Sequence, residues 1–197
     1  MGTNYYARII PSHERKEKLK SLIDSDDFDK IKEEVSLMYG SVGDYDKDGG
    51  EIHLGKRSGG WKFLWNANQY MVDEGHYDMD EGKWISNYVI HNYYEPNKKS
   101  ITEFLNRDDV RIFDEYGEEF TFDEFVNETG CFEENPVWGD GKPCYDAESY
   151  VKEHKEGYNS FLYSDIKQQM YIDMGFDVKY HEFKNDGLRF STSTVFC

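Results

Sequence analysis

Basic residues are scarce in this sequence. It has 23 Lys and Arg against 40 Asp and Glu, a formal net charge of −17. Because phosphate recognition needs a basic stripe, this balance argues against direct binding of nucleic acid. The excess is greatest between residues 102 and 157, where 17 acidic and 5 basic residues give −12. The acidity indicates either solubility alone or a surface that meets cations or a basic partner.

Cysteine is also rare, with only Cys131, Cys144 and Cys197. Their odd number and wide spacing match neither a disulfide framework nor a CxxC zinc motif, so we expect reduced thiols. The sequence shows no signal-peptide pattern and no apolar run of about 18 residues that could span a membrane. We therefore expect a cytoplasmic protein that makes no membrane contact.

Motifs of catalysis are missing as well. There is no GxSxG segment, and the six histidines show neither HxH nor HxxxH spacing. Asp114 and Glu115 are adjacent and point apart on a strand or turn, which is poor geometry for a carboxylate pair. The sequence assigns no catalytic residue, no cofactor and no metal site, and favours binding over catalysis.

One weak metal alternative lies before the first glycine pair. Asp44, Asp46 and Asp48 precede Gly49, as in the first half of an EF-hand calcium loop. Position 12 of such a loop is Gly55 in place of the bidentate Glu, and no helix is expected to follow. An Asp- and Gly-rich turn is the preferred interpretation.

Aromatic residues are abundant and make up 17% of the chain, which argues against a disordered protein. The clearest local pattern is a β-hairpin over residues 51–65. Its two runs alternate apolar and polar residues on either side of Ser58-Gly59-Gly60. We expect the rings of the second run to lie in the core; they are Trp61, Phe63 and Trp65.

Capping and periodicity signals place the other elements. They predict helices over 13–23, 28–38, 101–106, 122–128, 147–155 and 161–174, with N-caps at Ser12, Asp27, Ser100, Thr121 and Asp146. Strands are predicted over 5–10, 110–113, 118–121, 176–182 and 188–194, and 84–94 is either a strand or a short helix. The fold class is α+β, with a mainly antiparallel sheet and the helices of 13–38 and 147–174 on one face. We expect one domain over 1–197, with loop 131–145 as a candidate internal boundary.

The hairpin offers one candidate ligand site. His53, Lys56 and the amides of Ser58, Gly59 and Gly60 could receive an anion, because glycine-rich turns present backbone N–H groups. The glycines lead into a strand and not into a helix, so this is no phosphate-binding loop of known type. A turn with flanking surface charges is the preferred interpretation.

Several separated blocks carry a resemblance. They are the start Met1-Gly2-Thr3-Asn4-Tyr5-Tyr6, a HIGKSSxGWxF-like block at 53–63, a DEYG turn at 114–117 with the acidic helix that follows, and a weaker block at 187–191. In these blocks the chain resembles a family of small proteins encoded by bacteriophages and prophages. Many relatives carry a CxxC-type pair between the first two blocks, which implies zinc. This chain has no cysteine there, so no zinc site is carried over. The resemblance implies a phage origin and an accessory, non-virion role.

These observations leave two main functional hypotheses. In the first, the acidic protein binds and inhibits a host anti-phage defence protein, such as a CRISPR effector or another nuclease with a basic groove. It would mimic nucleic acid, as an anti-CRISPR or anti-restriction protein would. In the alternative, the 53–60 hairpin binds or converts a nucleotide-like small molecule. A binding module without an anti-defence role is a third reading, and the oligomeric state stays open. The residues predicted to contact the partner are Glu115, Tyr116, Glu118, Glu119, Asp123 and Glu124.

Overall fold

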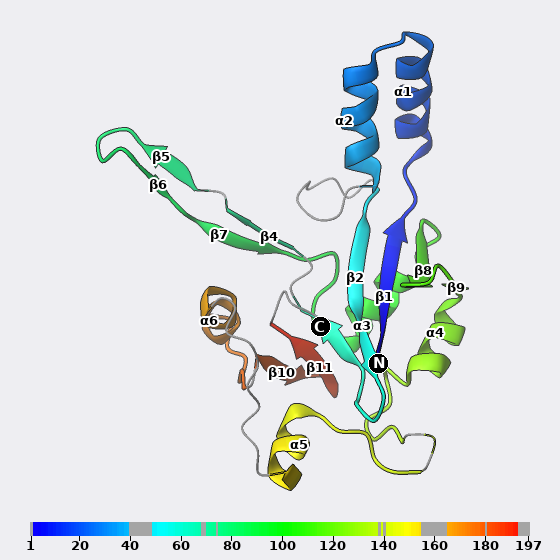
Figure 1. The fold of residues 1–197 in the computed structure, drawn as a ribbon, viewed down its shortest axis with the longest axis vertical. Helices are drawn as coiled ribbons and strands as arrows, with labels where there is room; N and C mark the ends of the chain where they lie inside the picture. The colour runs from blue at the N-terminus through cyan, green and yellow to red at the C-terminus, as the bar shows by residue number, and fades with distance from the viewer. Residues whose placement is uncertain are drawn as a thin grey trace.

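The computed structural model describes residues 2–39, 49–67, 70–73, 75–137, 139, 141–154, 165–179 and 181–192. At its centre a seven-stranded sheet has the order β10-β11-β3-β2-β1-β8-β9 (Figure 1). Neighbouring strands are antiparallel except β11 and β3, which are parallel. The predicted α+β class with a mainly antiparallel sheet is confirmed. The strands are β1 (Gly2–Ile9), β2 (Glu51–Ser58), β3 (Leu64–Asn66), β8 (Val110–Asp114), β9 (Glu119–Phe120), β10 (Glu182–Asn185) and β11 (Leu188–Ser191).

The predicted hairpin of 51–65 is present as β2 and β3, with a shorter second strand than expected. Gly55 lies opposite Trp65. A Cβ atom on Gly55 would lie 2.3 Å from the Leu64 carbonyl oxygen and 2.6 Å from the Phe63 ring. Only glycine fits where the two strands and this ring approach so closely.

A β-bulge in the hairpin decides which side chains share a face of the sheet. Tyr5 is opposite Gly55 whereas Tyr6 is opposite His53, so β2 has one residue more than β1 at this point. The extra residue is Leu54, which is fully buried. As a result, His53, Lys56 and Ser58 project from one face of the sheet, which we call the open face, and the core lies on the other.

The centre of the core is built from aromatic rings on β1, on the segment that ends in β3, and on α4. Trp65 and Phe125 are fully buried, and their ring centroids are 6.0 Å apart. The Phe125 ring is also 5.4 Å from Tyr5 and 5.7 Å from Phe63, in edge-to-face geometry. Such pairs add to the stabilisation from burial, so Phe125 ties α4 to β1, to β3 and to Phe63 just before β3.

A helical layer covers the core face. It consists of α3 (Lys98–Leu105), α4 (Phe122–Thr129) and α6 (Asp165–Asp173), which pack through Phe104, Phe125 and Tyr171. The Tyr171 ring lies 5.0 Å from Phe183, and its hydroxyl donates a hydrogen bond of 2.5 Å to the Ala67 carbonyl. Helices on one face of the sheet are therefore confirmed, but of the helices predicted there only α6 belongs to this layer, without the pair of 13–38 and without the helix that begins at Ala147.

That first pair projects beyond the sheet. α1 (His13–Asp24) and α2 (Phe28–Tyr39) form a hairpin that extends away from the end of β1 (Figure 1). Their described side chains contribute no member to the apolar core. The side chains buried between them are Arg15 and Glu34, whose Nε and Oε1 atoms are 2.9 Å apart. We call residues 13–36 the helical projection.

A second projection is a long β-ribbon. Its inner part pairs β4 (Tyr70–Asp73) with β7 (Tyr88–His91), and its outer part pairs β5 (His76–Asp78) with β6 (Lys83–Ile85). The ribbon leaves the sheet on the side opposite to β8 and β9 (Figure 1). The open choice for 84–94 is thereby decided in favour of strands.

Several local predictions are wrong or incomplete. The strand predicted over 176–182 begins only at Glu182, because β10 spans Glu182–Asn185. α3 begins one turn before the predicted start, because the extended Asn97, and not Ser100, caps it; the Asn97 side chain accepts from the Ser100 amide at 2.8 Å. The helix predicted over 161–174 is described as α6 from Asp165 to Asp173; Tyr171 is buried, at 1% exposure, and Met174, which follows the helix, is 57% exposed. Trp61 is half-buried outside the core, because it leaves the β2–β3 pairing and bridges to Tyr145.

One more helix lies after the long loop. α5 (Ala147–His154) follows loop 131–145, and the Asp146 carboxylate accepts from the Ser149 amide at 2.8 Å, as a helix cap does. The same carboxylate is 2.9 Å from Lys184 on β10. The Tyr145 amide donates to the Gly60 carbonyl at 2.7 Å. These contacts hold the loop and α5 against the hairpin and the C-terminal strands.

Candidate functional site

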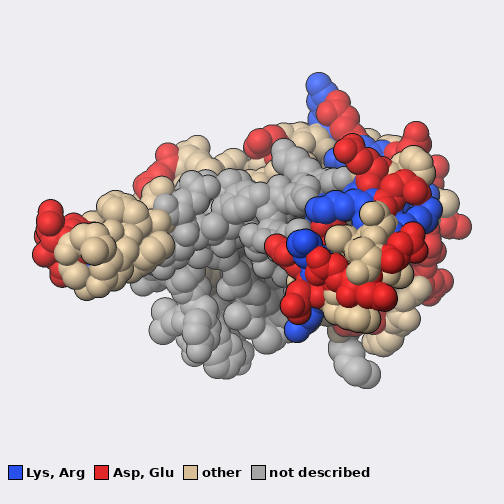
Figure 2. Space-filling model, turned by 90° about the horizontal axis from the view of Figure 1, so that it is seen from above, with Lys and Arg blue, Asp and Glu red and all other residues tan. Residues whose placement is uncertain are grey.

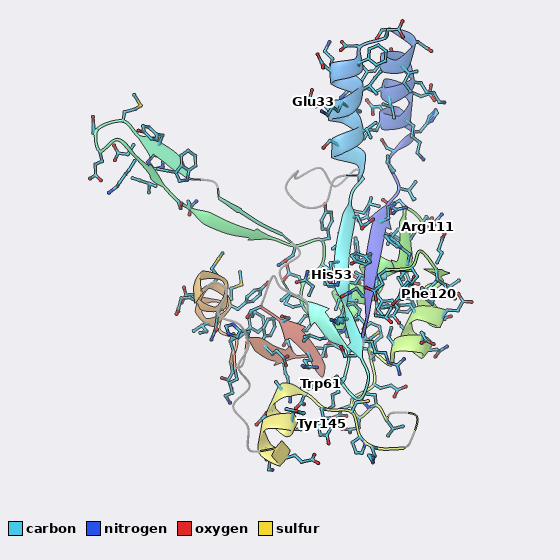
Figure 3. The ribbon with its side chains drawn as sticks, viewed as in Figure 1. Glu33, His53, Trp61, Arg111, Phe120 and Tyr145 are labelled. Atoms are coloured by element: carbon cyan, nitrogen blue, oxygen red, sulfur yellow. The ribbon has the colours of Figure 1, made fainter. Side chains whose placement is uncertain are left out.

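The predicted partner-binding residues lie together at the free edge of the sheet. They come from the turn between β8 and β9, from β9 and from the first turn of α4, a region that Figure 3 marks with Arg111 and Phe120. Residues 111–124 contain six acidic residues and one basic residue, a net charge of −5. We call this stretch the acidic edge.

A buried aspartate shapes the turn of the acidic edge. The Asp114 side chain is 7% exposed, and its Oδ1 atom accepts from the amides of Tyr116 and Glu118, both at 2.9 Å. Gly117, with a φ angle of 86°, allows the chain to close the turn and donates to the Asp114 carbonyl at 3.1 Å. Asp114 is therefore structural, and the turn holds the backbone of Tyr116, whose side chain is 79% exposed.

Three of the predicted acidic residues already have local partners. The Glu115 carboxylate accepts from the Asn4 amide nitrogen at 2.8 Å, and Glu119 lies 3.5 Å from the exposed Arg111. Glu124 completes the capping box of α4 by accepting from the Thr121 amide at 2.8 Å, which lowers the pKa of this carboxyl. The capping box was predicted from the sequence and is confirmed.

Two acidic residues have no such role. Glu118 and Asp123 are exposed, and neither makes a side-chain hydrogen bond or ion pair with another residue in the described ranges. A negative charge in the first turn of α4, such as that of Asp123, interacts favourably with the helix dipole. The edge thus presents Tyr116, Glu118 and Asp123 on an ordered backbone.

The side chains of the alternative site share the open face of the hairpin. The half-buried His53 ring lies 5.0 Å from Tyr6 on the open face. Burial lowers the pKa of its imidazole to about 4, so His53 is neutral near pH 7. Lys56 and Ser58 lie on the same face but against β1: a Cβ atom on Gly2 would be 2.4 Å from Ser58 Oγ. Lys56 is left as the cation of this set.

The glycine turn of the hairpin is partly used by the fold. The Trp61 amide donates to the Ser58 carbonyl at 2.9 Å, which closes the turn. The next amide, that of Lys62, donates to the Tyr145 carbonyl at 2.7 Å. Gly59 is exposed, and Gly60 has a φ angle of 79°. Any anion would therefore meet the amides of Gly59 and Gly60 and not those that follow.

The other candidate ligands are quickly placed. Asp44, Asp46 and Asp48 of the calcium alternative lie outside the described residues. Within the described ranges no three His, Cys, Asp or Glu side chains form a group that could hold a metal ion. Cys131 is buried, which raises the pKa of its thiol to about 12, and burial also raises the pKa of Cys144. Neither thiol is poised as a nucleophile.

None of the described helices has the length and apolar character needed to cross a bilayer.

Sequence reasoning missed the aromatic ladder of the open face. Tyr6 stacks on Phe113 at 5.6 Å and faces His53, and the Arg8 guanidinium lies 4.6 Å above the Phe113 ring. Arg8 also pairs with Glu51 at 3.0 Å. The signal was the alternation of β1, which puts Tyr6 and Arg8 on the face opposite Tyr5 and Ala7. The partners across the sheet are set by register, which the sequence did not give.

Comparison of the chain with models of protein families, with curated proteins and with solved structures finds no match.

Proposed function

We propose that this chain is a phage-encoded accessory protein whose acidic edge binds and inhibits a bacterial anti-phage defence protein. The observation that carries the proposal is that the backbone of this edge is ordered by its own hydrogen bonds. A buried Asp114 fixes the turn, and a capping box fixes the start of α4. Between them Tyr116, Glu118 and Asp123 are exposed without a structural task.

The chemistry of the edge defines the partner. A groove that normally holds nucleic acid is lined with Lys and Arg, and a rigid acidic surface can occupy it in place of phosphates. Because the backbone is already ordered, little conformational entropy is lost on binding. An exposed tyrosine adds contact area at low entropic cost. CRISPR effectors and restriction nucleases present such grooves, and direct binding of nucleic acid by this chain is not part of the proposal.

A charge-neutral variant tests the proposal. Glu118→Gln, Glu119→Gln and Asp123→Asn remove three charges and leave Asp114 and the Glu124 cap in place. The control removes the same charge from exposed positions on the helical projection: Asp24→Asn, Asp29→Asn and Glu33→Gln. Figure 3 labels Glu33, far from the acidic edge. Both variants keep the folded core, so a difference between them reports the surface.

The measurement is binding to a panel of purified CRISPR effectors and restriction nucleases, with duplex DNA as competitor. We expect DNA to compete with the protein for binding. We also expect binding to weaken as salt rises from about 50 mM to about 500 mM, because the screening length of electrostatic attraction shortens with ionic strength. The edge variant should bind about tenfold more weakly than the control, mainly through a slower association rate. Binding that is flat with salt, or equal in the two variants, contradicts the proposal.

A second candidate function is favoured by one observation, the aromatic ladder beside the hairpin. Tyr6 and Phe113 offer ring surfaces for a base, and Lys56 offers a charge for phosphate. Titration calorimetry with cyclic nucleotides and nucleotide sugars tests this. Heat that disappears in Lys56→Gln and Tyr6→Leu supports a small-molecule binder, and no heat with any of these ligands rejects it.

A further inference from the structure

The aromatic ladder of the open face, formed by His53, Tyr6 and Phe113, runs in a line toward the acidic edge. His53 on β2 is opposite Tyr6 on β1, which is opposite Phe113 on β8. The next residue in this line is Glu119 on β9, which is opposite Phe113. Residues directly opposite each other in an antiparallel pair project from the same face of the sheet. The ladder therefore crosses three strands and ends beside a carboxylate of the acidic edge.

The ladder is an ordered strip of rings that solvent can reach. The ring centroids of His53 and Tyr6 are 5.0 Å apart, and those of Tyr6 and Phe113, which are stacked, are 5.6 Å apart. All three residues are half-buried, whereas Arg8 and Arg111 in the next row of the same face are exposed. Because the sheet already holds the rings in place, little side-chain entropy is lost when a partner covers them.

Two of the acids predicted to contact the partner belong to this face as well. The Glu115 carboxylate accepts a hydrogen bond of 2.8 Å from the side chain of Asn4. Asn4 and Tyr6 are alternate residues of β1, so their side chains share a face. Glu119 shares the same face because it is opposite Phe113. A partner that covers these two carboxylates therefore lies against the end of the ladder.

The far side of the ladder carries the opposite charge. Lys56 on β2 is opposite Asn4, so it projects from the open face. Among the residues that the structure describes, its side chain has no ion pair and no hydrogen bond. Arg8 on the same face is already paired with Glu51 at 3.0 Å. The face thus presents carboxylates at the acidic edge, rings in the middle and the ammonium group of Lys56 on β2.

An interface of ordinary size reaches across the ladder. A specific complex buries roughly 800 Å² on each partner, which corresponds to a disc of roughly 16 Å radius. Neighbouring strands lie about 4.8 Å apart, so Phe113, Tyr6 and His53 are roughly 5, 10 and 15 Å from β9. A partner that meets the acidic edge from the side of Glu115 and Glu119 therefore covers the ladder as well.

We propose that the surface that binds the defence protein extends from the acidic edge across the open face, with Phe113 and Tyr6 as its anchors. This inference rests on the function proposed above and describes its partner more closely. Beside the cations of its groove, the partner presents an apolar strip against the ladder and a carboxylate against Lys56. The charges speed the encounter of the two proteins, and the covered rings slow their dissociation.

Binding kinetics with the panel of CRISPR effectors and restriction nucleases test the anchors. Phe113→Leu keeps an apolar side chain but removes the ring, and should raise the dissociation rate about tenfold at low and at high salt alike. The control, Tyr77→Leu, should leave the rate unchanged. Tyr77 is 53% exposed and opposite Trp84 in the outer ribbon, whose residues 76–85 we call the ribbon tip. The ribbon tip extends away from the sheet, on the side opposite to the acidic edge (Figures 1 and 2).

A charge reversal tests the other side of the ladder. Lys56→Glu places a carboxylate against the carboxylate expected on the partner, and should weaken binding more at low salt than at high salt, because salt screens the repulsion. Lys99→Glu is the matched control, since Lys99 is exposed on α3, which covers the core face. Equal effects of the two reversals would show a general response to net charge and would overturn the predicted contact at Lys56.

A footprint of the unchanged chain keeps the test decisive even if a variant disturbs the sheet. In the complex, hydroxyl-radical oxidation of Tyr6 and Phe113 should fall about twofold or more, because the partner covers their rings, and that of Tyr77 should stay the same. If the charge-neutral variant of the acidic edge weakens binding but Phe113→Leu and the footprint show no change, this inference is overturned and the proposed function stands. If no nuclease of the panel binds, both are overturned.

Discussion

The sheet body and the helical projection are held together by opposite means. In the body, Trp65, Phe125 and Phe190 are fully buried and belong to one core cluster that is rich in aromatic rings. In the projection, the buried side chains are Arg15 and Glu34, at 6% and 3% exposure. Lys18 lies 2.6 Å from the same glutamate. One region depends on apolar area and the other on charge.

This difference teaches how the two regions respond to change. Apolar burial stabilises in proportion to area and does not depend on protonation. A buried ion pair offsets a large desolvation cost only while both charges are present. The projection shares no member with the core, so it should open locally while the body stays folded. The body is the scaffold of the acidic edge, and the projection is a separately adjustable unit.

The largest expected effect comes from the centre of the body. Phe125→Ala removes the ring that joins α4 to Tyr5, Phe63 and Trp65, and should lower the free energy of unfolding by about 4 kcal/mol. Urea denaturation measures this loss. The control is Phe28→Ala on α2, where the ring is 74% exposed and should cost less than about 0.5 kcal/mol. Similar losses at both positions would remove the distinction between the two regions.

The next effect is local to the projection. Glu34→Gln leaves the Arg15 guanidinium buried without its carboxylate, and should lower the opening free energy of the hairpin by roughly 2–3 kcal/mol. Hydrogen exchange should speed up across residues 13–36 and stay unchanged in β1, β2 and β8. Glu33→Gln, one position earlier and exposed, is the matched control. Faster exchange throughout the sheet would show that the projection and the body unfold together.

Acid should produce the same local opening without a substitution. Lys18, and then Arg15, hold the pKa of Glu34 below its ordinary value. A carboxyl with a lowered folded pKa contributes stability above its unfolded pKa and loses that contribution as pH falls through the folded one. The projection should therefore loosen below about pH 4, near the ordinary Glu value. Amide chemical shifts of 13–36 followed from neutral to acid pH measure it. The Glu34→Gln variant should lack this transition, and its persistence there would assign the transition to another group.

How far the sequence foretold the structure depends on the kind of signal. Thr121 and Glu124 announce the capping box because the pattern is local, and the strand at 110–113 follows from alternation alone. The sequence did not foretell that α1 and α2 leave the sheet. Their apolar residues at helical spacing predicted a covering layer, whereas packing buried Arg15 with Glu34. An ion pair between two helices produces no periodic pattern in the sequence from which it could be predicted.

The acidic edge and the ribbon tip differ in the same way. Six of the acidic-edge residues were chosen from composition, and all lie in one region because they are neighbours in sequence. Their individual roles, such as the Glu124 cap, needed coordinates or a motif. The face shared by Tyr77 and Trp84 depends on register across a turn, which the irregular stretch of 70–82 concealed. The acidic edge could be predicted from the charges along the sequence, whereas the surface formed by pairing of two strands could not.

The smallest expected effect uses the same chemistry in both regions. Thr121 and Ser12 cap α4 and α1, and each hydroxyl accepts from a backbone amide three residues later at 3.2 Å. Alanine at either cap should cost about 1 kcal/mol. For Thr121→Ala the loss should appear in global urea unfolding, because α4 carries Phe125 into the core. For Ser12→Ala it should appear only as faster exchange in residues 13–24. If both variants shift the urea midpoint equally, the projection unfolds together with the body, and the contrast between apolar and ionic burial does not separate the two regions in unfolding.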